Sequence, residues 1–349
     1  MVATISSSTP LLLSILWLTD GVEGTDAVDW RSTLASNRYR AILPARALIQ
    51  AGHQVQLVPI EGWRFDPSAL RPDVIVVGKL LPGGPASRFS TLSQNLLREI
   101  ATATASGVRV LADFNDDHFD RPGIGSYWRR LAQTVRGCVA GSDTMADRLR
   151  RLTPAPIFVA GDPLASPRGE PRVFQPPNAA GRWVRGLLGG AANPTRLKLV
   201  WYGHPINWPA MRAWLSALEA LRETQPYLLW VVTQPHPMVQ ADLDAHNHRA
   251  APGGLAELIP WDEEVQWATV ADSDVVLIPS DPSDPKKAVK TSNRLTDALK
   301  AGRSVIASPL PAYRPYENHA LMTDDPLAAL RQMLADPAAA LDRVREGQL

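Results

Sequence analysis

The stretch Lys290–Pro309, KTSNRLTDALKAGRSVIASP, decides the fold class, because it combines a short amphipathic helix, a turn and an apolar strand. It follows another apolar run, DVVLIPS at residues 274–280, so strand, helix and strand succeed one another. Strands that are apolar along their whole length are typical of parallel sheets covered by helices on both faces. The stretch therefore predicts an α/β fold built on a parallel sheet.

The same alternation extends along the chain in two blocks. The first runs from LLSILWL at residues 12–18 to PIFVAGDP at 156–163, and the second begins with LKLVWYG at 197–203. The segment between them is rich in Pro, Gly and Ala and lacks sustained periodicity, which is typical of a linker. We predict two Rossmann-like domains facing a central cleft. Their bounds are 1–168, a linker at 169–195, 196–325, and terminal helices at 326–349 that could pack back toward the first domain.

Composition excludes several classes of protein. The chain has 349 residues, enough for two domains, and 36 basic against 35 acidic side chains give a net charge of +1. This balance argues against a general nucleic-acid binder. The single cysteine, Cys138, forms no intrachain disulfide. The apolar run at residues 10–18 is shorter than the ~20 residues that span a bilayer, so we expect a cytoplasmic protein. Peripheral contact with the inner face of the membrane stays open.

Polar side chains share one face of the helix in the opening stretch. At about 100° per residue, three of them fall together behind a lysine and two hydroxyl residues suited to cap the helix. Backbone N–H groups, the helix dipole and a lysine make an anion site. The alternative is a solvated face with a weak Arg294–Asp297 pair. The candidate residues are Lys290, Thr291, Ser292, Asn293, Arg294 and Asp297.

The sequence WYGHPIN supplies a second candidate at the end of the second block's first strand. Gly203 would let a ligand approach the backbone closely, and His204 and Asn207 precede a helix. The alternative is a plain turn between a strand and a helix.

The acidic run ADFNDDHFD supplies a third candidate. Asp116, Asp117 and His118 follow a strand, where clustered carboxylates can act as a base or bind a hard cation. No further metal ligand is well placed in the sequence, so we predict no metal site and no cofactor. The alternative is an acidic loop that caps the next segment.

The first domain supplies a fourth candidate. Asp20 and Gly21 begin a glycine-bearing loop, and Arg38 and Arg40 start the helix after it. These residues could hold an acidic or phosphate group of a second substrate, or form a solvated helix end. The sequence has no G-x-x-x-x-G-K-[ST], no G-x-G-x-x-G after the first strand and no G-x-S-x-G, which weighs against the corresponding enzyme classes.

Together these stretches resemble the two-domain GT-B glycosyltransferases, in particular the group 1, or family-4-like, enzymes of bacterial surface-polysaccharide assembly. ADSDVVLIPS at 271–280 and KTSNRLTDALKAGRSVIASPLPAYRPY at 290–316 look like the family's donor-site block. SNRYRAILPARALIQAGHQVQLV at 36–58 resembles its first helix and second strand, and VLADFNDDHFD at 110–120 resembles a pattern of its first domain.

The resemblance implies roles for single residues. Asp297 falls where the family has a glutamate that holds the nucleotide ribose, Arg294 where relatives have a lysine, and Gly203 where the donor phosphates lie. The family's other glutamate would fall at Val289, so that acid is missing here.

The implied function is transfer of a sugar from a nucleotide-diphosphate sugar to a glycan, lipid-linked or small-molecule acceptor, without a metal. The enzyme would be a hexosyl- or deoxyhexosyl-transferase that retains the anomeric configuration. The donor would bind the second domain, the acceptor would bind near Asp20, Gly21, Arg38 and Arg40, and Asp116, Asp117 or His118 would face the reaction. The alternatives are an epimerase or hydrolase of the same fold, or a non-catalytic partner subunit, which the missing acid at Val289 suggests.

Overall fold

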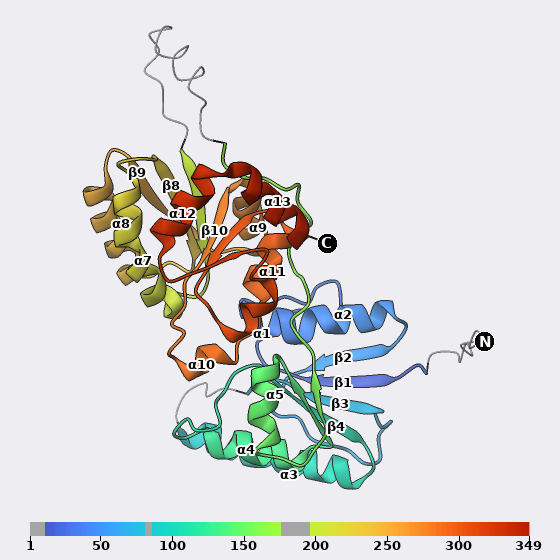
Figure 1. Ribbon diagram of the computed structural model, residues 1–349. Coiled ribbons are helices and arrows are strands. Elements are labelled where there is room, and N and C mark those ends of the chain that lie inside the picture. Colours follow the sequence, from blue (N-terminus) through green and yellow to red (C-terminus); the bar gives the residue numbers. More distant parts are fainter. Residues whose placement is uncertain (1–10, 81–85, 176–195, 349) are drawn as a thin grey trace, which may run out of the picture. The chain divides into compact units, whose positions relative to one another are not determined.

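The computed structural model describes residues 11–80, 86–175 and 196–348 (Figure 1). It divides the chain into two compact units, Met1–Pro163 with Val289–Thr291, and Leu164–Ala288 with Ser292–Leu349. We predicted that the first domain ends at residue 168, whereas the structure assigns residues from Leu164 onward to the second unit. The start of the predicted linker also belongs there, because Phe174 lies in that unit's core. Residues 176–195 of the predicted linker lie outside the described residues.

The first unit is built on a six-stranded sheet in which every described pair of neighbours is parallel. The strand order is β2-β1-β3-β4-β5-β6. The strands are β1 (Ser14–Leu18), β2 (Gln54–Val58), β3 (Val74–Val77), β4 (Arg109–Phe114), β5 (Gly137–Ala140) and β6 (Ile157–Val159).

Helices cover both faces of this sheet, because a parallel pair needs a crossover connection. Successive strand residues face opposite sides, so Ile15 and Trp17 pack with Ile42 and Ala45 in one apolar cluster, whereas Leu18 belongs to the cluster on the other side. The helical segments are α1 (Ala35–Asn37), the π-helical turn η1 (Arg38–Ile42), α2 (Leu43–Gln50), α3 (Ala86–Ala105), α4 (Gly125–Thr134) and α5 (Asp143–Arg150).

The second unit contains another six-stranded parallel sheet, with the order β12-β11-β10-β7-β8-β9. This is the strand order of a Rossmann fold, with β7 in the place of the first strand. Both sheets confirm the predicted α/β class. The strands are β7 (Leu197–Tyr202), β8 (Tyr227–Thr233), β9 (Gly254–Pro260), β10 (Val275–Ile278), β11 (Ser304–Ala307) and β12 (Leu321–Met322).

Two apolar clusters flank the second sheet. Leu199 and Trp201 pack on one side, and Val200 and Tyr202 pack on the other. The helical segments are η2 (Pro205–Asn207), α7 (Trp208–Leu221), α8 (Pro237–Ala250), α9 (Glu263–Asp272), α10 (Pro285–Ala288), α11 (Asn293–Lys300), η3 (Pro311–Tyr316), α12 (Pro326–Ala335) and α13 (Pro337–Gly347).

We expected that the last two helices could pack back toward the first domain, and this stays a prediction. In the structure α12 packs against α7 and β11, and α13 packs against β11 and α11. Ala329 and Leu330 of α12 lie in the second unit's core. Apolar burial within their own unit therefore holds these helices.

Candidate functional site

The carboxyl end of β7 is the first candidate site, because the strand order changes direction there. The chain continues from β7 to β8 on one side, whereas β10 is the neighbour of β7 on the other. Ligands of open parallel sheets bind outside the carboxyl ends of the strands at such a switch point. β7 ends at Tyr202 and β10 at Ile278, so Gly203, His204 and Asn207 follow directly at this point.

Arg294 of α11 lies beside Gly203. A Cβ atom built on Gly203 would lie 3.6 Å from Nη1 of Arg294, an ordinary contact distance that places the guanidinium group beside this glycine. That Nη1 atom is buried and has no hydrogen-bond partner within the described residues. Burial of an N–H group without an acceptor costs free energy. An anion bound at the end of β7 would satisfy this guanidinium group.

A second cation is held at the same loop. Nζ of Lys287 donates to Oδ1 of Asn207 over 2.6 Å. His204 fixes the start of the loop, because its Nδ1 accepts from the backbone N of Ile206 at 3.1 Å. Asn207 therefore positions a lysine, and Lys287 and Arg294 give the loop after β7 a positive field suited to phosphate.

The first turn of α11 is organised differently from our prediction. We expected Thr291 or Ser292 to cap the helix, but Ser292 stands at the N-cap position without a side-chain cap hydrogen bond. Oδ1 of Asn293 accepts instead from the backbone N of Arg294 at 2.7 Å. Asn293 thus fixes the residue whose guanidinium group faces Gly203.

Asp297 is fully buried, with an exposed fraction of 0%. Its Oδ1 accepts from the backbone N atoms of Ala165 at 2.7 Å and Ser166 at 2.8 Å. The hydroxyl of Ser166 also donates to the backbone O of Asp297 at 2.8 Å. This carboxylate anchors the segment that begins the second unit, and it presents no surface to a ribose in this conformation. The ribose role stays a prediction against which the burial counts.

The first unit holds a charged cluster at the carboxyl ends of the paired strands β3 and β4. Asp116, only 7% exposed, forms ion pairs with Lys79 and Lys290. Burial raises the pKa of Asp116, but the charges of Lys290 and Lys79 outweigh this effect and hold the pKa well below its usual range. The carboxylate of Asp116 is therefore ionised and is paired with two ammonium groups. Lys290, predicted as the phosphate ligand, is committed to this carboxylate.

His118 stands next to the cluster as a neutral side chain. Both ring nitrogens are buried without a hydrogen-bond partner in the part of the chain that the structure describes, and Nε2 lies 3.9 Å from Oδ2 of Asp116. Burial lowers the pKa of His118 to about 4; the nearby Asp116 opposes the shift, while Lys79, Arg121 and Lys290 add to it. A neutral imidazole with two unsatisfied nitrogens can donate to one ligand hydroxyl and accept from another.

Asp117, the third predicted catalytic residue, has structural partners. Its Oδ1 accepts from the backbone N of Phe119 at 3.1 Å, and its Oδ2 accepts from Nε of Arg148 at 3.1 Å. These contacts fix the loop after β4 to α5. The structure thus brings Asp116 and His118 together, whereas Asp117 forms structural contacts with the backbone of its own loop and with Arg148.

Arg40 is also structural, which does not favour the predicted acceptor contact. It is 9% exposed, and its Nε donates to Oδ2 of Asp113 over 3.0 Å. Its Nη1 donates to the backbone O of Ala160 at 2.6 Å and lies 3.2 Å from Oδ1 of Asp162. Thr291 belongs to the same hydrogen-bond network, because its hydroxyl donates to Oδ2 of Asp162 over 2.5 Å.

The other predicted acceptor residues shape the loops around β1. Oδ1 of Asp20 accepts from the backbone N of Ile60 at 2.8 Å. Gly21 has a φ of 74°, which a residue with a side chain rarely adopts. Nη1 of Arg38 donates to the backbone O of Ser32 at 3.0 Å. Each residue orders backbone, and their role in acceptor binding stays a prediction.

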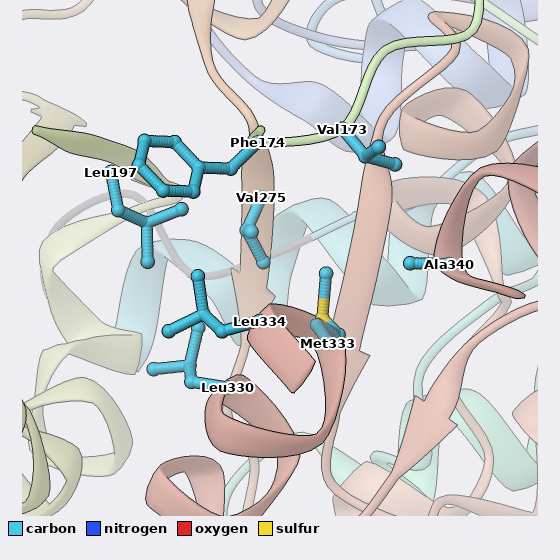
Figure 2. Close-up of a pocket in the computed structure, with 8 residues that line it drawn as sticks. All are labelled: Val173, Phe174, Leu197, Val275, Leu330, Met333, Leu334 and Ala340. Atoms are coloured by element: carbon cyan, nitrogen blue, oxygen red, sulfur yellow. The ribbon is translucent and has the colours of Figure 1, made fainter. Parts of the chain in front are cut away.

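A small cavity in the second unit is not a candidate site. Its volume is about 10 Å³, which is close to the minimum for one water molecule. Figure 2 shows side chains from the core around it, all of them apolar. Its lining consists of Val173, Phe174, Leu197, Val275, Leu330, Met333, Leu334 and Ala340.

Grouped metal ligands and membrane-spanning helices are both absent from the described residues. No three His, Cys, Asp or Glu side chains are grouped to hold a metal ion within residues 11–80, 86–175 and 196–348. Over the same residues, none of the helices combines the length and apolarity that crossing a bilayer needs. The cytoplasmic location and the peripheral membrane contact stay predictions.

Sequence reasoning missed one site residue, Lys79, and one contact, that of Lys287 with Asn207. Lys79 follows β3 directly, in the same way that the acidic run follows β4, so neighbouring strand ends could have suggested the pair. Lys287 stands in PKKA between two turns, and nothing in its spacing indicates the contact with Asn207, which lies 80 positions earlier.

Comparison with known proteins identifies the fold. No protein-family model and no curated protein matches the sequence. Anabaena HepE (Alr3699), solved with UDP and glucose, is 12% identical, with a TM-score of 0.56 over 96% of this chain and 94% of that one. The catalytic domain of Arabidopsis thaliana starch synthase IV, solved with ADP and acarbose, is 11% identical, with a TM-score of 0.60 over 97% and 95%. A Rickettsia africae glycosyltransferase is 10% identical, with a TM-score of 0.60 over 97% and 92%. At such identities the likeness shows the fold, and the GT-B fold implied by the resemblance is confirmed.

Proposed function

We propose that the protein transfers a sugar from a nucleotide-diphosphate sugar to an acceptor hydroxyl group. The observation that carries this proposal is the buried Nη1 of Arg294, which has no hydrogen-bond partner among the described residues and lies beside Gly203 at the switch point of a Rossmann-type sheet. Similar folds support it, since structures of HepE contain UDP or UDP-glucose and a starch synthase structure contains ADP.

The donor diphosphate would bind at the loop after β7. Arg294 and Lys287 would bind its oxygens, and the first N–H groups of α11 would add the positive end of the helix dipole. In the reaction, the bond between the sugar's anomeric carbon and the diphosphate oxygen breaks, the acceptor oxygen bonds to that carbon, and the acceptor's proton passes to the leaving diphosphate. The nucleoside diphosphate leaves with the bonding electrons. Two fixed cations stabilise the charge that develops on it, so we propose metal-independent transfer.

His118 and Asp116 of the first unit would take different roles toward the substrate. Two lysines surround Asp116 and hold its pKa low, which makes it a poor proton acceptor. His118 is neutral at pH values above its pKa of about 4, and its two ring nitrogens have no hydrogen-bond partner among the described residues. We assign His118 a hydrogen bond to a substrate hydroxyl group, and Asp116 the positioning of the two lysines.

The finer features of the reaction belong to the same proposal. The resemblance supports a hexosyl or deoxyhexosyl group, retention of the anomeric configuration, and a glycan, lipid-linked or small-molecule acceptor. Proton NMR of the first product formed would report its anomeric configuration, and an inverted product would exclude retention.

The test is binding of UDP, GDP, ADP and dTDP, measured by thermal shift and calorimetry. A true ligand at 100 times its Kd adds about 2.7 kcal/mol to the free energy of unfolding. We expect Arg294→Met to weaken the best nucleotide at least about tenfold, which corresponds to ~1.4 kcal/mol. Arg331→Met, which changes an exposed arginine of α12, is the matched control and should bind normally.

Two results would contradict the proposal. The first is that none of the four nucleotides stabilises the protein. The second is that Arg294→Met binds as tightly as the control. Release of free sugar from the donor at the rate of transfer would instead identify a hydrolase of the same fold.

A further inference from the structure

A polar groove lies in the first unit, and its lining does not include the charged cluster of Asp116. Its volume is about 540 Å³, within the ~300–1,000 Å³ range of small-molecule sites. One wall is the loop that follows β2, and the other is the first half of α3. The lining residues are Glu61, Gly62, Arg64, Ser87, Arg88, Thr91, Leu92 and Asn95.

The loop that forms one wall is held at both ends by carboxylates. Oδ1 of Asp20 accepts from the backbone N atoms of Ile60 at 2.8 Å and Glu61 at 3.3 Å. Oε2 of Glu99 on α3 accepts from the backbone N of Phe65 at 3.1 Å. A wall fixed before binding loses little entropy when a ligand arrives. The groove is therefore preformed.

The middle of this wall stays open. Gly62 has a φ of 82°, and apart from its own chain neighbours no heavy atom of the described residues lies within 4 Å of the place where a Cβ atom would stand. The glycine thus turns the loop without filling the groove.

The polar groups of the groove suit hydroxyl groups. Nη2 of Arg88 donates to both carboxylate oxygens of Glu61, at 2.5 and 2.8 Å, and both side chains are more than half exposed. An exposed pair of this kind contributes only ~0–1 kcal/mol, so a ligand can separate it at small cost. Ser87, Thr91 and Asn95 each carry groups that donate and groups that accept. Sugar hydroxyl groups do both.

Charge argues against an anionic ligand. The two arginines at the groove are matched by two glutamates, since Arg88 pairs with Glu61, and Nε of Arg64 lies 3.8 Å from Oε1 of Glu99. Each arginine of the groove therefore already has a carboxylate partner, although Glu99 itself lies outside the lining. Leu92, half-buried, adds the one branched aliphatic side chain of the lining, against which the C–H face of a sugar ring can pack.

We propose that this groove binds a neutral saccharide. Its use as the acceptor site rests on the proposed glycosyltransferase function, whereas the binding itself does not. As an acceptor site, the groove is an alternative to the contacts predicted for Arg38 and Arg40. Asp20 supports it indirectly, as the residue that fixes its wall.

The test is retention of the labelled full-length protein on an array of short hexose oligosaccharides, neutral and acidic. We expect binding to neutral members, and at least tenfold weaker binding by Arg88→Ala and by Asn95→Ala. Arg130→Ala, which changes an exposed arginine of α4, is the control and should bind normally. The inference is wrong if no neutral saccharide binds, if only acidic ones bind, or if both groove variants bind like the control.

Nucleotide binding by the same variants separates this inference from the proposed function. Arg88→Ala and Asn95→Ala should keep the thermal shift with the best nucleoside diphosphate, which also shows that they are folded. Saccharide retention without any nucleotide binding would leave the groove assigned and remove the glycosyltransferase proposal. Nucleotide binding without retention of neutral saccharides would keep the glycosyltransferase proposal and remove the assignment of the groove.

Discussion

Removal of the Arg40 guanidinium group should destabilise the protein far more than it affects substrate binding. Arg40 joins three segments of the first unit, since it bonds Asp113 at the end of β4 and the backbone O of Ala160 beyond β6. In Arg40→Met, Asp113 stays buried at 4% exposure without its cation. Breaking a buried ion pair from one side costs ~3–5 kcal/mol. For a unit of this size the melting temperature should fall by on the order of 10 °C.

The loss should also depend on pH. Burial raises the pKa of Asp113 even beside Arg40, and Arg40→Met removes the positive charge that opposes burial. A carboxyl group whose pKa is higher in the folded state stabilises that state below the unfolded pKa of ~3.9. This contribution is lost as the pH rises through the folded pKa. The deficit of Arg40→Met should therefore be larger at pH 8 than at pH 5.

Urea unfolding followed by tryptophan fluorescence at these two pH values measures the effect. The double variant Arg40→Met with Asp113→Leu is the control, because an apolar pair of similar volume restores much of what a broken ion pair loses. A loss below about 1 kcal/mol in Arg40→Met, together with a raised KM for the acceptor, would refute this reasoning. It would support the acceptor role that the sequence suggested.

Three further results are expected. Asp297→Ala should lose ~2–4 kcal/mol of unfolding free energy, because two backbone N–H groups lose their acceptor. Asp297→Asn keeps an oxygen at this place and should lose less. Equal losses by the two variants in guanidinium unfolding would contradict the anchoring role of Asp297. His118 charges in the unfolded state near pH 6.5 and in the folded state only near pH 4, so stability should fall as the pH drops through that window. His118→Phe should reduce this loss of stability at acid pH. An unchanged loss in thermal melts of the variant would contradict the assignment to His118. Tyr227→Phe should cost ~1–2 kcal/mol by calorimetry, since the tyrosine hydroxyl lies 2.9 Å from Nε2 of the buried His246; no loss would show that this contact is dispensable.

The fold class could be predicted because apolar periodicity is local. LLSILWL and DVVLIPS each contain a strand of a parallel sheet, and LKLVWYG contains the strand at the second unit's switch point. The site was accessible to the same reasoning wherever a residue follows a strand directly. Gly203 and the run around Asp116 and His118 were found in this way, and Lys79 could have been.

The contact partners of these residues could not be predicted from the sequence. Asp297 and Arg294 share a short helix, yet one is anchored to Ala165 and the other faces Gly203. Helical periodicity placed both on one face and assigned both to a ligand. Burial distinguishes them, because the carboxylate of Asp297 has 0% exposure and already accepts two backbone hydrogen bonds, which counts against the predicted ligand role.

The sequence by itself determined two parallel-sheet units, the strand ends where chemistry can occur, and the residue types present there. Only the tertiary structure decided which charges neutralise one another. Lys290 pairs with Asp116, 174 positions earlier in the chain, and Arg40 pairs with Asp113, 73 positions later. Spacing along a helix or strand governs neighbours a few residues apart, whereas these pairs form because packing of distant segments removes them from water. That burial turns predicted ligand contacts into structural ones and leaves Arg294 and His118 with buried nitrogens that a substrate could satisfy.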